Sequence, residues 1–294
     1  MQGFLLIDKP EGITSFSAVS RIKRLAHEKR VGHTGTLDPL ATGVLPIFVG
    51  RATALSSILL EAEKQYTATV KLGITTDTCD VTGEVQSEKC VSVTKAELLD
   101  QLQKFKGEIS QIPPIYSALK KDGVRLYELA RRGEEVEIEP RQVRINTLDL
   151  LEFEDDTFKI YVSCSKGTYI RSLCRDIGEA LGCGATMTAL RRNATCGFSE
   201  EDAVKLDDLT EENISQYLKS EEWAVRHLRE VNVSEKQAIR FSNGGQLGFD
   251  RLRETNFGSG ELLRVKHKDK FLGIGYADNE KEQIAIKCII NRLD

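Results

Sequence analysis

The sequence contains few of the residues that usually bind transition metals. Its four histidines stand at positions 27, 33, 227 and 267, and its seven cysteines form no Cys-x-x-Cys pair and no Cys/His spacing of a zinc site. An odd number of cysteines without such a spacing is typical of reduced thiols that are mostly buried. We therefore predict that the protein has no metal site.

Long apolar runs are also missing. None approaches the roughly 18 residues that a membrane-spanning helix needs. The first run, residues 4–7, is stopped by Asp8 and Lys9 and is too short for the core of a secretory signal. We therefore expect a cytoplasmic protein with no membrane partner. Because the sequence also has no long heptad pattern, we expect a monomer.

The acidic residues are unevenly distributed. Residues 199–222 carry nine acidic residues against two lysines, a local charge of −7, so the rest of the chain carries +3 although the total is −4. Basic residues gather at 21–30 and at 120–132. Such groups bind phosphates or simply form solvated helix faces, and the charges alone leave both interpretations open.

Helix and strand patterns alternate in the first 200 residues. Residues 4–7 predict a strand, and Thr14 or Ser15 is placed to cap a helix whose apolar residues share one face. Thr94 and Glu97 have the spacing of a capping box that opens a helix. The other predicted elements are strands at 44–49, 66–72, 143–153, 158–164 and 186–190, and helices at 52–62 and 168–181.

The pattern changes in the last third of the chain. The acidic residues 199–222 predict a surface turn and helix, and short strands follow at 262–267, 271–276 and 284–290. A chain of 294 residues is long enough for a large domain and a small appended one. We place the boundary near residue 230.

Residues 33–45, HTGTLDPLATGVL, hold a single acid, Asp38. Pro39 pushes Asp38 toward an extended conformation, and Gly35 and Gly43 permit backbone angles that other residues avoid, so we predict a shaped loop. Asp38 could close a turn in this loop. As a carboxylate ionised at neutral pH, it could also act as a nucleophile or stabilise a cationic sugar.

Two other enzyme classes fit this loop less well. In aspartyl-phosphate enzymes the nucleophile precedes the Lys-Thr-Gly-Thr element, whereas Asp38 follows His33-Thr34-Gly35-Thr36 and no lysine is present. A nucleotide-binding P-loop would need the pattern G-x-x-x-x-G-K-[ST], which is absent.

Five long motifs follow one another along the chain. They are KPEGITSF (9–16), GHTGTLDPLATGVLPIFVGRAT (32–53), KQYTATVKLGITTDTCDVTG (64–83), IPPIYSALKKDGVRLYELARRG (112–133) and CSKGTYIRSLCRDIGEALGCGA (164–185). In this order they resemble the motifs of the TruB family, the tRNA pseudouridine-55 synthases. The resemblance covers about the first 200 residues, and QAIRFSNGGQL (237–247) extends it more weakly.

The resemblance implies an α+β fold of the pseudouridine synthase type. Its central sheet would be mixed and largely antiparallel, with flanking helices, and a small C-terminal β-rich domain of the PUA type would follow. We accordingly expect a catalytic domain at 1–230, with an RNA-clamping insertion at about 112–140, and a PUA-like RNA-binding domain at 231–294.

The implied reaction is the isomerisation of uridine 55 in the T loop of tRNA to pseudouridine. By motif match, Asp38 would be the nucleophile, Arg171 its pairing cation, and Tyr66 the side chain that stacks on the flipped uracil. Lys9, His33, Tyr169 and Leu190 would line or brace the substrate pocket. The reaction adds and removes nothing, so we expect no cofactor.

The implied substrate is the T stem-loop of tRNA. The basic groups at 21–30 and 120–132 would contact its backbone, and residues 117–133 would close over the loop, so we expect this segment to be mobile without RNA. The sequence does not decide whether Asp38 attacks the ribose or the uracil ring. A non-catalytic RNA-binding protein and an aspartyl-phosphate enzyme remain the alternative functions.

Overall fold

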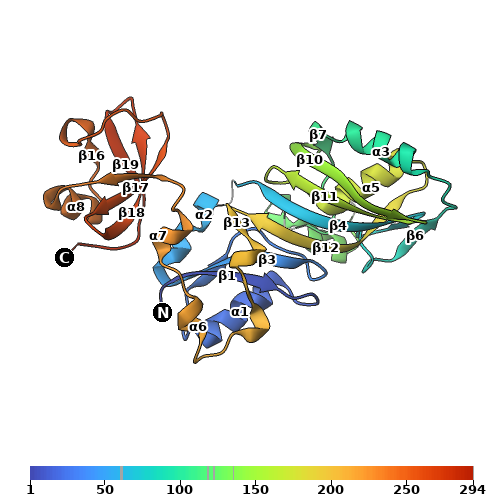
Figure 1. Ribbon diagram of the computed structural model, residues 1–294, viewed down its shortest axis with the longest axis horizontal. Helices are drawn as coiled ribbons and strands as arrows, with labels where there is room; N and C mark the ends of the chain where they lie inside the picture. Colours follow the sequence, from blue (N-terminus) through green and yellow to red (C-terminus); the bar gives the residue numbers. More distant parts are fainter. Residues whose placement is uncertain (60–61, 118, 122, 135, 294) are drawn as a thin grey trace.

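The computed structural model describes residues 1–59, 62–117, 119–121, 123–134 and 136–293. In these residues the chain forms a ten-stranded sheet and a five-stranded sheet, which lie at different ends of an elongated molecule (Figure 1). The strands of the larger sheet are β1 (Gly3–Lys9), β2 (Val31–His33), β3 (Thr42–Val49), β4 (Lys64–Leu72), β7 (Gly107–Gln111), β10 (Arg141–Glu154), β11 (Thr157–Cys164), β12 (Ala185–Thr195), β13 (Phe198–Ser199) and β14 (Val204–Lys205).

The main path through the larger sheet runs β14-β1-β3-β12-β4-β11-β10-β7. Only the pairs β1–β14 and β3–β12 are parallel, which confirms the expected mixed, largely antiparallel sheet. This order places β3, which follows the Asp38 loop, against β12, and β12 against β4. Residues far apart in the sequence thereby meet at the centre of the sheet.

Strand β4 shows why this centre is stable. Tyr66, Ala68, Val70 and Leu72 are buried while the residues between them are partly exposed, so every second side chain enters the core. This two-residue period matches the alternation of a pleated strand with one buried face. The strand predicted at 66–72 is confirmed and begins two residues earlier.

Three helices flank the larger sheet: α1 (Ser15–Leu25), α3 (Lys95–Lys104) and α5 (Ile170–Ala180). The Thr14 side chain accepts a hydrogen bond from Ser17 N at the start of α1, and Thr94 and Glu97 form the predicted capping box of α3. Helix α5 packs on β12, with buried residues at 170, 173, 174 and 177 that follow the helical period.

The helix predicted at 52–62 is wrong in its first part. Residues Gly50–Leu55 form a 3₁₀ turn, α2 spans only Ser56–Leu59, and residues 60 and 61 lie outside the described part. Thr53 Oγ1 donates to Gly50 O and Ser56 Oγ donates to Thr53 O. These local side-chain hydrogen bonds favour a tight turn over a regular helix.

The smaller sheet contains β15 (Arg229–Asn232), β16 (Leu247–Gly248), β17 (Leu262–His267), β18 (Lys270–Asp278) and β19 (Gln283–Ile289). Its strand order is β15-β17-β18-β19-β16, and helix α8 (Glu235–Ser242) packs against it. The three late strands predicted from sequence are confirmed. The boundary expected at residue 230 falls inside β15, so the second sheet begins at Arg229.

An aromatic cluster joins the two sheets. Phe4 and Phe198 of the larger sheet lie 5.0 Å apart between ring centroids, and Trp223 stacks on Phe198 at 4.8 Å. Helix α7 (Glu221–Ala224) carries Trp223, and the same cluster includes Phe271 and Ile274 of the smaller sheet. One hydrophobic cluster therefore contains residues of both sheets, separate from the main core of each.

The acidic segment lies beside helix α1 rather than apart from it. Asp207 pairs with Arg21 at 2.6 Å, and Glu211 lies 3.1 Å from His27. The segment consists of short 3₁₀ turns (Glu200–Asp202 and Leu206–Asp208) and two four-residue helices, α6 (Ile214–Tyr217) and α7. Part of the basic group at 21–30 is therefore already paired with acids.

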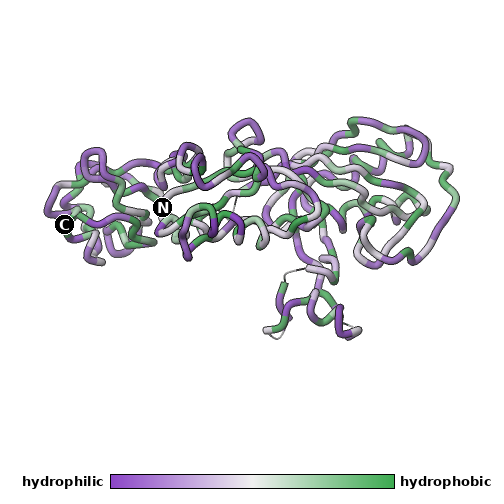
Figure 2. The backbone as a smooth tube through the Cα atoms, turned by 90° about the horizontal axis from the view of Figure 1, so that it is seen from below, coloured by the Kyte–Doolittle hydropathy of each residue, from purple (hydrophilic) through white to green (hydrophobic). Residues whose placement is uncertain are grey.

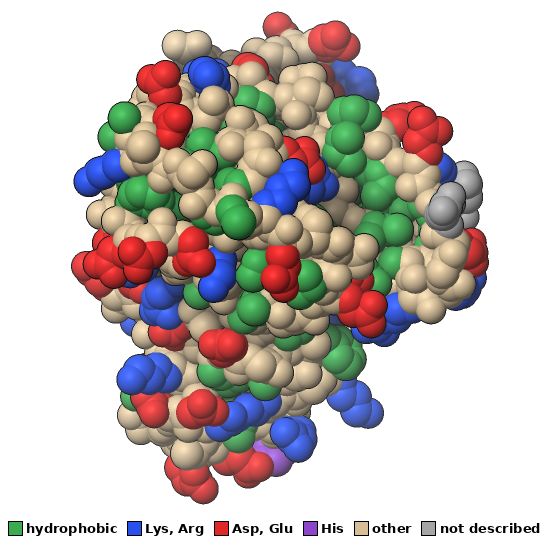
Figure 3. Space-filling view, turned by 90° about the vertical axis from the view of Figure 1, so that its right-hand side faces the viewer, with side chains coloured by type: hydrophobic (Ala, Val, Ile, Leu, Met, Phe, Trp, Pro, Cys, Tyr) green, Lys and Arg blue, Asp and Glu red, His purple; other side chains and the backbone are tan. Residues whose placement is uncertain are grey.

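The expected insertion forms a separate small unit. Strands β8 (Lys120–Lys121) and β9 (Val124–Arg125) pair, and helix α4 (Leu126–Arg131) follows. This unit projects from the body of the molecule (Figure 2). On the face seen in Figure 3, acidic and basic side chains are interspersed, and hydrophobic side chains gather between the body and the projecting unit. A second hairpin, β5 (Ile74–Thr76) with β6 (Val85–Glu88), follows β4.

Strands β3 and β12 approach each other closely at Gly43. A Cβ at Gly43 would lie 2.3 Å from Arg192 O, and its φ of +100° disfavours other residues. We expect Gly43→Ala to lower the free energy of unfolding by roughly 3 kcal/mol, from steric overlap and backbone strain together. Gly182 is the matched control, because its φ is +80° and a Cβ added there would meet no atom within 4 Å. Gly182→Ala should lower the free energy of unfolding, measured by urea denaturation, by only about 1 kcal/mol. Equal losses of stability in the two variants would contradict the close approach of β3 and β12 at Gly43.

Candidate active site

The Asp38 loop links β2 to β3. Ala41 N donates to Asp38 O at 3.1 Å, so the backbone of Asp38 closes the turn. Its carboxylate is not used in that turn and instead pairs with Arg171, with 2.9 Å between Oδ2 and Nε. The backbone of Asp38 therefore closes a turn, while its carboxylate is left to pair with a cation.

Arg171 brings four parts of the chain together. It lies in the first turn of α5 with its side chain only 6% exposed. Besides pairing with Asp38, its guanidinium donates to Thr78 O at 3.1 Å and to Tyr116 O at 2.9 Å, and Asp80 Oδ2 lies 3.7 Å from Nε. A planar guanidinium with several partners has a fixed orientation. Arg171 therefore holds the Asp38 carboxylate in one place and links it to the root of the insertion.

Asp80 is a second acid in the site, to which sequence reasoning assigned no role. It is buried, and its carboxylate accepts hydrogen bonds from Thr78 Oγ1 and Thr82 N. The cluster of threonines and aspartates at 75–82 is typical of a loop with local side-chain to backbone bonds. That pattern signals a turn and does not reveal that the turn reaches Arg171.

The surroundings of Asp38 act on its pKa in opposite directions. Burial raises the pKa of the Asp38 carboxyl above its usual value, the Arg171 guanidinium opposes that rise, and the Asp80 charge adds to it. The side chain is still 37% exposed. A carboxylate that is open on one side and held by a cation on the other is suited to attack a bound molecule.

Lys9 lies behind the loop. Its side chain is fully buried, and Nζ donates to Pro10 O and Ile13 O at 2.8 Å each and to Pro39 O at 3.4 Å. Burial lowers the pKa of the Lys9 ammonium to about 8. Since no part of Lys9 is exposed, its position fits bracing of the loop beside Asp38 and does not fit direct contact with a substrate.

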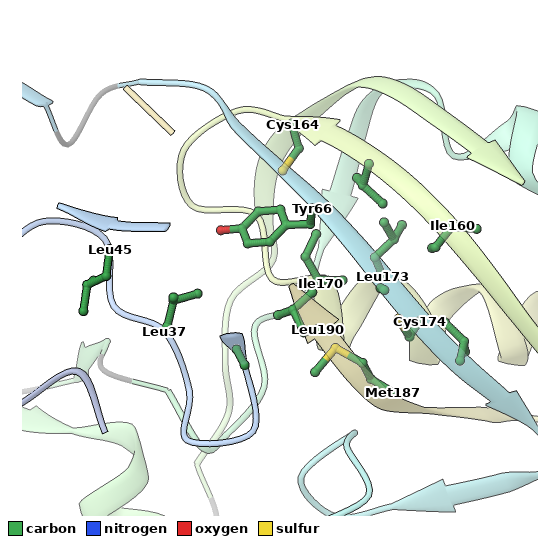
Figure 4. Packing of buried hydrophobic residues seen from close by; sticks show 14 of the residues in the cluster. Leu37, Leu45, Tyr66, Ile160, Cys164, Ile170, Leu173, Cys174, Met187 and Leu190 are labelled. Atoms are coloured by element: carbon green, nitrogen blue, oxygen red, sulfur yellow. The ribbon is translucent and has the colours of Figure 1, made fainter. Parts of the chain in front are cut away.

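Tyr66 and Leu190 lie on adjacent strands. Both are buried, in β4 and β12 respectively, and they share the main core cluster with Leu37 and Ile170. Figure 4 shows the Tyr66 ring extending from β4 toward the segment that carries Leu37 and Leu45, with Ile170 and Leu190 beside it. Burial raises the pKa of the Tyr66 hydroxyl, and the positive charge of Arg192 opposes that rise. These side chains together form an apolar surface with one hydroxyl group, that of Tyr66.

His33 and Tyr169 lie at the ends of elements around Asp38. His33 ends β2, and burial together with the Arg192 charge lowers its pKa, which favours the neutral ring. Tyr169 is the N-cap of α5, and the Gln111 side chain clamps its backbone by accepting from Tyr169 N at 2.8 Å and donating to Tyr169 O at 3.1 Å. Gln111 thus fixes the start of the helix that carries Arg171.

Sequence reasoning missed Arg192. It is completely buried in β12, yet a run of two arginines usually marks an exposed, solvated segment. Its neighbour Arg191 does behave that way, since it pairs with Asp8 and Glu200 and remains 37% exposed. The two-residue period of β12 is the signal that separates them, because Leu190 and Arg192 share the buried side.

No group of three or more His, Cys, Asp and Glu side chains close enough to hold a metal ion occurs in the part of the chain that the structure describes. Within the same residues, no helix is both long and apolar enough to span a membrane.

Comparison with known protein families matches most of the chain. Residues 23–170 match the model of the TruB family pseudouridylate synthase N-terminal domain, and residues 171–232 match that of the tRNA pseudouridylate synthase B C-terminal domain. Among curated proteins, tRNA pseudouridine synthase B of Clostridium perfringens (strain 13 / Type A) is 44% identical over 283 residues, which cover 95% of this chain and 96% of the relative. The enzyme of the same name from Chromobacterium violaceum is 43% identical over 297 residues, covering 99% of this chain and 96% of the relative.

Solved structures share the whole fold. One is a crystal structure of a Cbf5-Nop10-Gar1 complex, with a TM-score of 0.78, 28% identity, and coverage of 99% of this chain and 85% of that chain. Another is an H/ACA RNP bound to a substrate RNA containing 2′-deoxyuridine, with a TM-score of 0.77, 26% identity, and coverage of 99% and 86%. With the family model, the close relatives and the fold in agreement, the chain belongs to the TruB family of pseudouridylate synthases.

Proposed function

We propose that this protein is a tRNA pseudouridine-55 synthase, which isomerises uridine 55 in the T loop of tRNA with Asp38 as the nucleophile. The main support for this proposal is the ion pair between Asp38 and Arg171, at 2.9 Å. It connects two of the family motifs, although the two residues are 133 positions apart in the sequence. The relatives named tRNA pseudouridine synthase B, alike over nearly their full length, support tRNA as the substrate.

The reaction needs one bond broken and another made at the same sugar carbon. The bond from C1′ to N1 of uracil breaks, the base turns, and C1′ bonds to C5. The C5 hydrogen leaves as a proton and N1 takes one up, so the composition of the nucleotide is unchanged. An ionised Asp38 supplies the electron pair for attack on C1′ or on the uracil ring, and both routes remain part of the proposal. Arg171 keeps the carboxylate ionised and oriented in either route.

The target base must leave the RNA stack to reach Asp38. Flipping costs on the order of a few kcal/mol, which stacking and phosphate contacts have to offset. The Tyr66 ring and the Leu190 side chain would provide an apolar surface for the uracil. We assign His33, at the end of β2, and Tyr169, at the start of α5, to the walls of the same pocket. Lys9 contributes by holding the loop at Pro39.

Other parts of the chain would hold the tRNA. We assign residues 112–140 to a clamp over the T loop and residues 231–294 to a PUA-like RNA-binding domain, attached to a catalytic domain at 1–230. The structure neighbour described as an RNP bound to a substrate RNA supports RNA binding by this fold. We further assign the protein to the cytoplasm and to a monomeric state.

Replacement of Asp38 tests the nucleophile directly. We expect Asp38→Asn to reduce tritium release from a T-arm RNA with C5-labelled uridine by at least about a thousandfold, because the amide cannot attack. The same variant should bind the RNA with near wild-type affinity in a filter-binding assay. Full turnover by Asp38→Asn would contradict the mechanism, while a wild-type protein that binds RNA without releasing tritium would favour a non-catalytic RNA-binding role.

The pH dependence of kcat/KM tests the ion pair. Asp38 must be ionised, and its pKa is raised by burial against the opposing effect of Arg171, so activity should fall on acidification through a pKa above that of an ordinary aspartate. Removing the cation in Arg171→Met should move this acidic limb upward by about one pH unit or more. Arg175→Met is the control, because Arg175 pairs with Asp176 in the same helix. An acidic limb that stays in place in Arg171→Met would refute the assigned role.

Hydrogen exchange tests the clamp. We expect backbone amides of α4 and the β8–β9 hairpin to exchange fast in the free protein and to slow on addition of T-arm RNA, because RNA would order this unit. Residues 118, 122 and 135 lie outside the described part of the structure. Amides of α3, which packs on β10 and contains no residue of the insertion, should show no change. Protection of the insertion without RNA would contradict the expected mobility.

A further inference from the structure

Arg192 is a buried cation without an acid. Its side chain has no exposed surface, and no carboxylate lies within ion-pair distance of it in the described part of the chain. Burying an unpaired charge opposes folding unless other groups solvate it. The position of Arg192 therefore needs an explanation beyond packing.

Two of its nitrogens hold the two ends of the Asp38 loop. Nε donates to Val44 O at 2.7 Å, and Nη2 donates to Gly35 O at 2.8 Å. A Cβ at Gly35 would lie 3.1 Å from Nη1, so glycine at this position allows the guanidinium to lie against the loop. Arg192 thus explains why both positions of the loop are glycine. A side chain at Gly43 would meet the backbone of Arg192, and one at Gly35 would meet its guanidinium.

The third nitrogen is unpaired. Nη1 is buried and forms no hydrogen bond of good geometry among the described residues, and the same holds for His33 Nδ1 and Thr34 Oγ1 at the start of the loop. The Tyr66 hydroxyl nevertheless lies close enough to Arg192 for a side-chain hydrogen bond to lower the pKa of that hydroxyl. A buried N–H without a well-placed acceptor is rare in folded proteins, and each one needs an explanation, of which a role in the site is one. Nη1 of Arg192 lies against Gly35, so this group is next to the Asp38 loop.

Tyr66 is the side chain nearest in register. Arg192 and Tyr66 are directly paired residues of the antiparallel strands β12 and β4. Directly paired residues project from the same face, with Cβ atoms about 5 Å apart. The Tyr66 ring extends toward the loop that Arg192 holds (Figure 4). The guanidinium and the phenol therefore share one space beneath the Asp38 loop.

The other groups that act on the Tyr66 hydroxyl oppose ionisation. They are the Cys164 thiol of β11 and the Asp38 carboxylate, both of which raise its pKa as burial does, whereas Arg192 lowers it. Arg192 is thus the cation that counters the combined effect of burial, thiol and carboxylate on this phenol.

We propose that Arg192 is a positioning residue, which fixes both ends of the Asp38 loop and directs its free Nη1 at the Tyr66 hydroxyl. A guanidinium can only donate, so the phenol oxygen must accept from it. The phenol proton is then directed away from Arg192, toward the space where the target uracil would stack. The inference rests on the proposed function for the role of Tyr66, but the contact itself can be measured without turnover.

A fluorinated tyrosine at position 66 measures the contact directly. We would place 3,5-difluorotyrosine there in the full-length chain, because its more acidic phenol titrates while the protein is folded, and follow its ¹⁹F resonance against pH. Arg192→Met should raise the titration midpoint by about one pH unit or more. Arg191→Met is the matched control, since Arg191 pairs with Asp8 and Glu200 instead, and its midpoint should equal that of the wild type. Equal midpoints for Arg192→Met and wild type would overturn the proposal.

Single-turnover tritium release provides a second test with a milder change. Arg192→Lys keeps the charge but cannot reach both Gly35 O and Val44 O with one nitrogen. The substitution Arg192→Lys is made both in the wild type and in the Tyr66→Phe variant. If Arg192 acts through Tyr66, the factor by which it slows tritium release should be at least about tenfold larger in the wild type than in Tyr66→Phe. Equal slowing in both backgrounds would reduce Arg192 to a structural role. Absence of tritium release from the wild type would refute the proposed function, while the ¹⁹F midpoints would still decide the contact.

Discussion

The ion pair between Asp38 and Arg171 is the interaction on which the site depends. A carboxylate placed among apolar side chains would take up a proton more readily, because burial disfavours its charge. Arg171 opposes this with a full charge at 2.9 Å and is itself held by the carbonyl groups of Thr78 and Tyr116. The Asp38 loop, helix α5, the turn between β5 and β6 and the root of the insertion are therefore held in fixed positions relative to one another by this one guanidinium.

Two further cations support the same loop from within the protein. The loop at 33–43 is rich in glycine and threonine, and its carbonyls accept hydrogen bonds mostly from outside the loop, among them Leu37 O from Ser15 Oγ and Pro39 O from Gly12 N. Lys9 donates to Pro39 O, and Arg192 donates to Gly35 O. Burying an ammonium and a guanidinium opposes folding, but each satisfies carbonyls that a strand or helix would otherwise satisfy. The protein thus gives up some stability for a loop with a fixed shape, as active sites commonly do.

The contacts of α5 connect the site to the part of the molecule proposed to close over RNA. Gln111 clamps the backbone of Tyr169, Ser172 Oγ donates to Ile112 O, and Arg171 donates to Tyr116 O. All of these partners lie where the chain leaves β7 for the insertion. Movement of that segment would therefore be transmitted to the guanidinium that holds Asp38. In the proposed function, RNA binding and the orientation of the carboxylate would share this one set of hydrogen bonds.

The sequence by itself determined the local elements and the kind of residues in the site. The alternation in β4, the capping box of α3 and the apolar spacing of α5 each encode which face is buried, and the motifs around Asp38, Tyr66 and Arg171 indicated the family. The helix predicted at 52–62 failed because side-chain hydroxyls competed with the backbone bonds. Only the tertiary structure placed Arg192 opposite Tyr66 and Asp80 beside Arg171. Those contacts depend on the strand order β3-β12-β4 and on loop paths, and residues so far apart in the chain leave no periodic pattern that would reveal them.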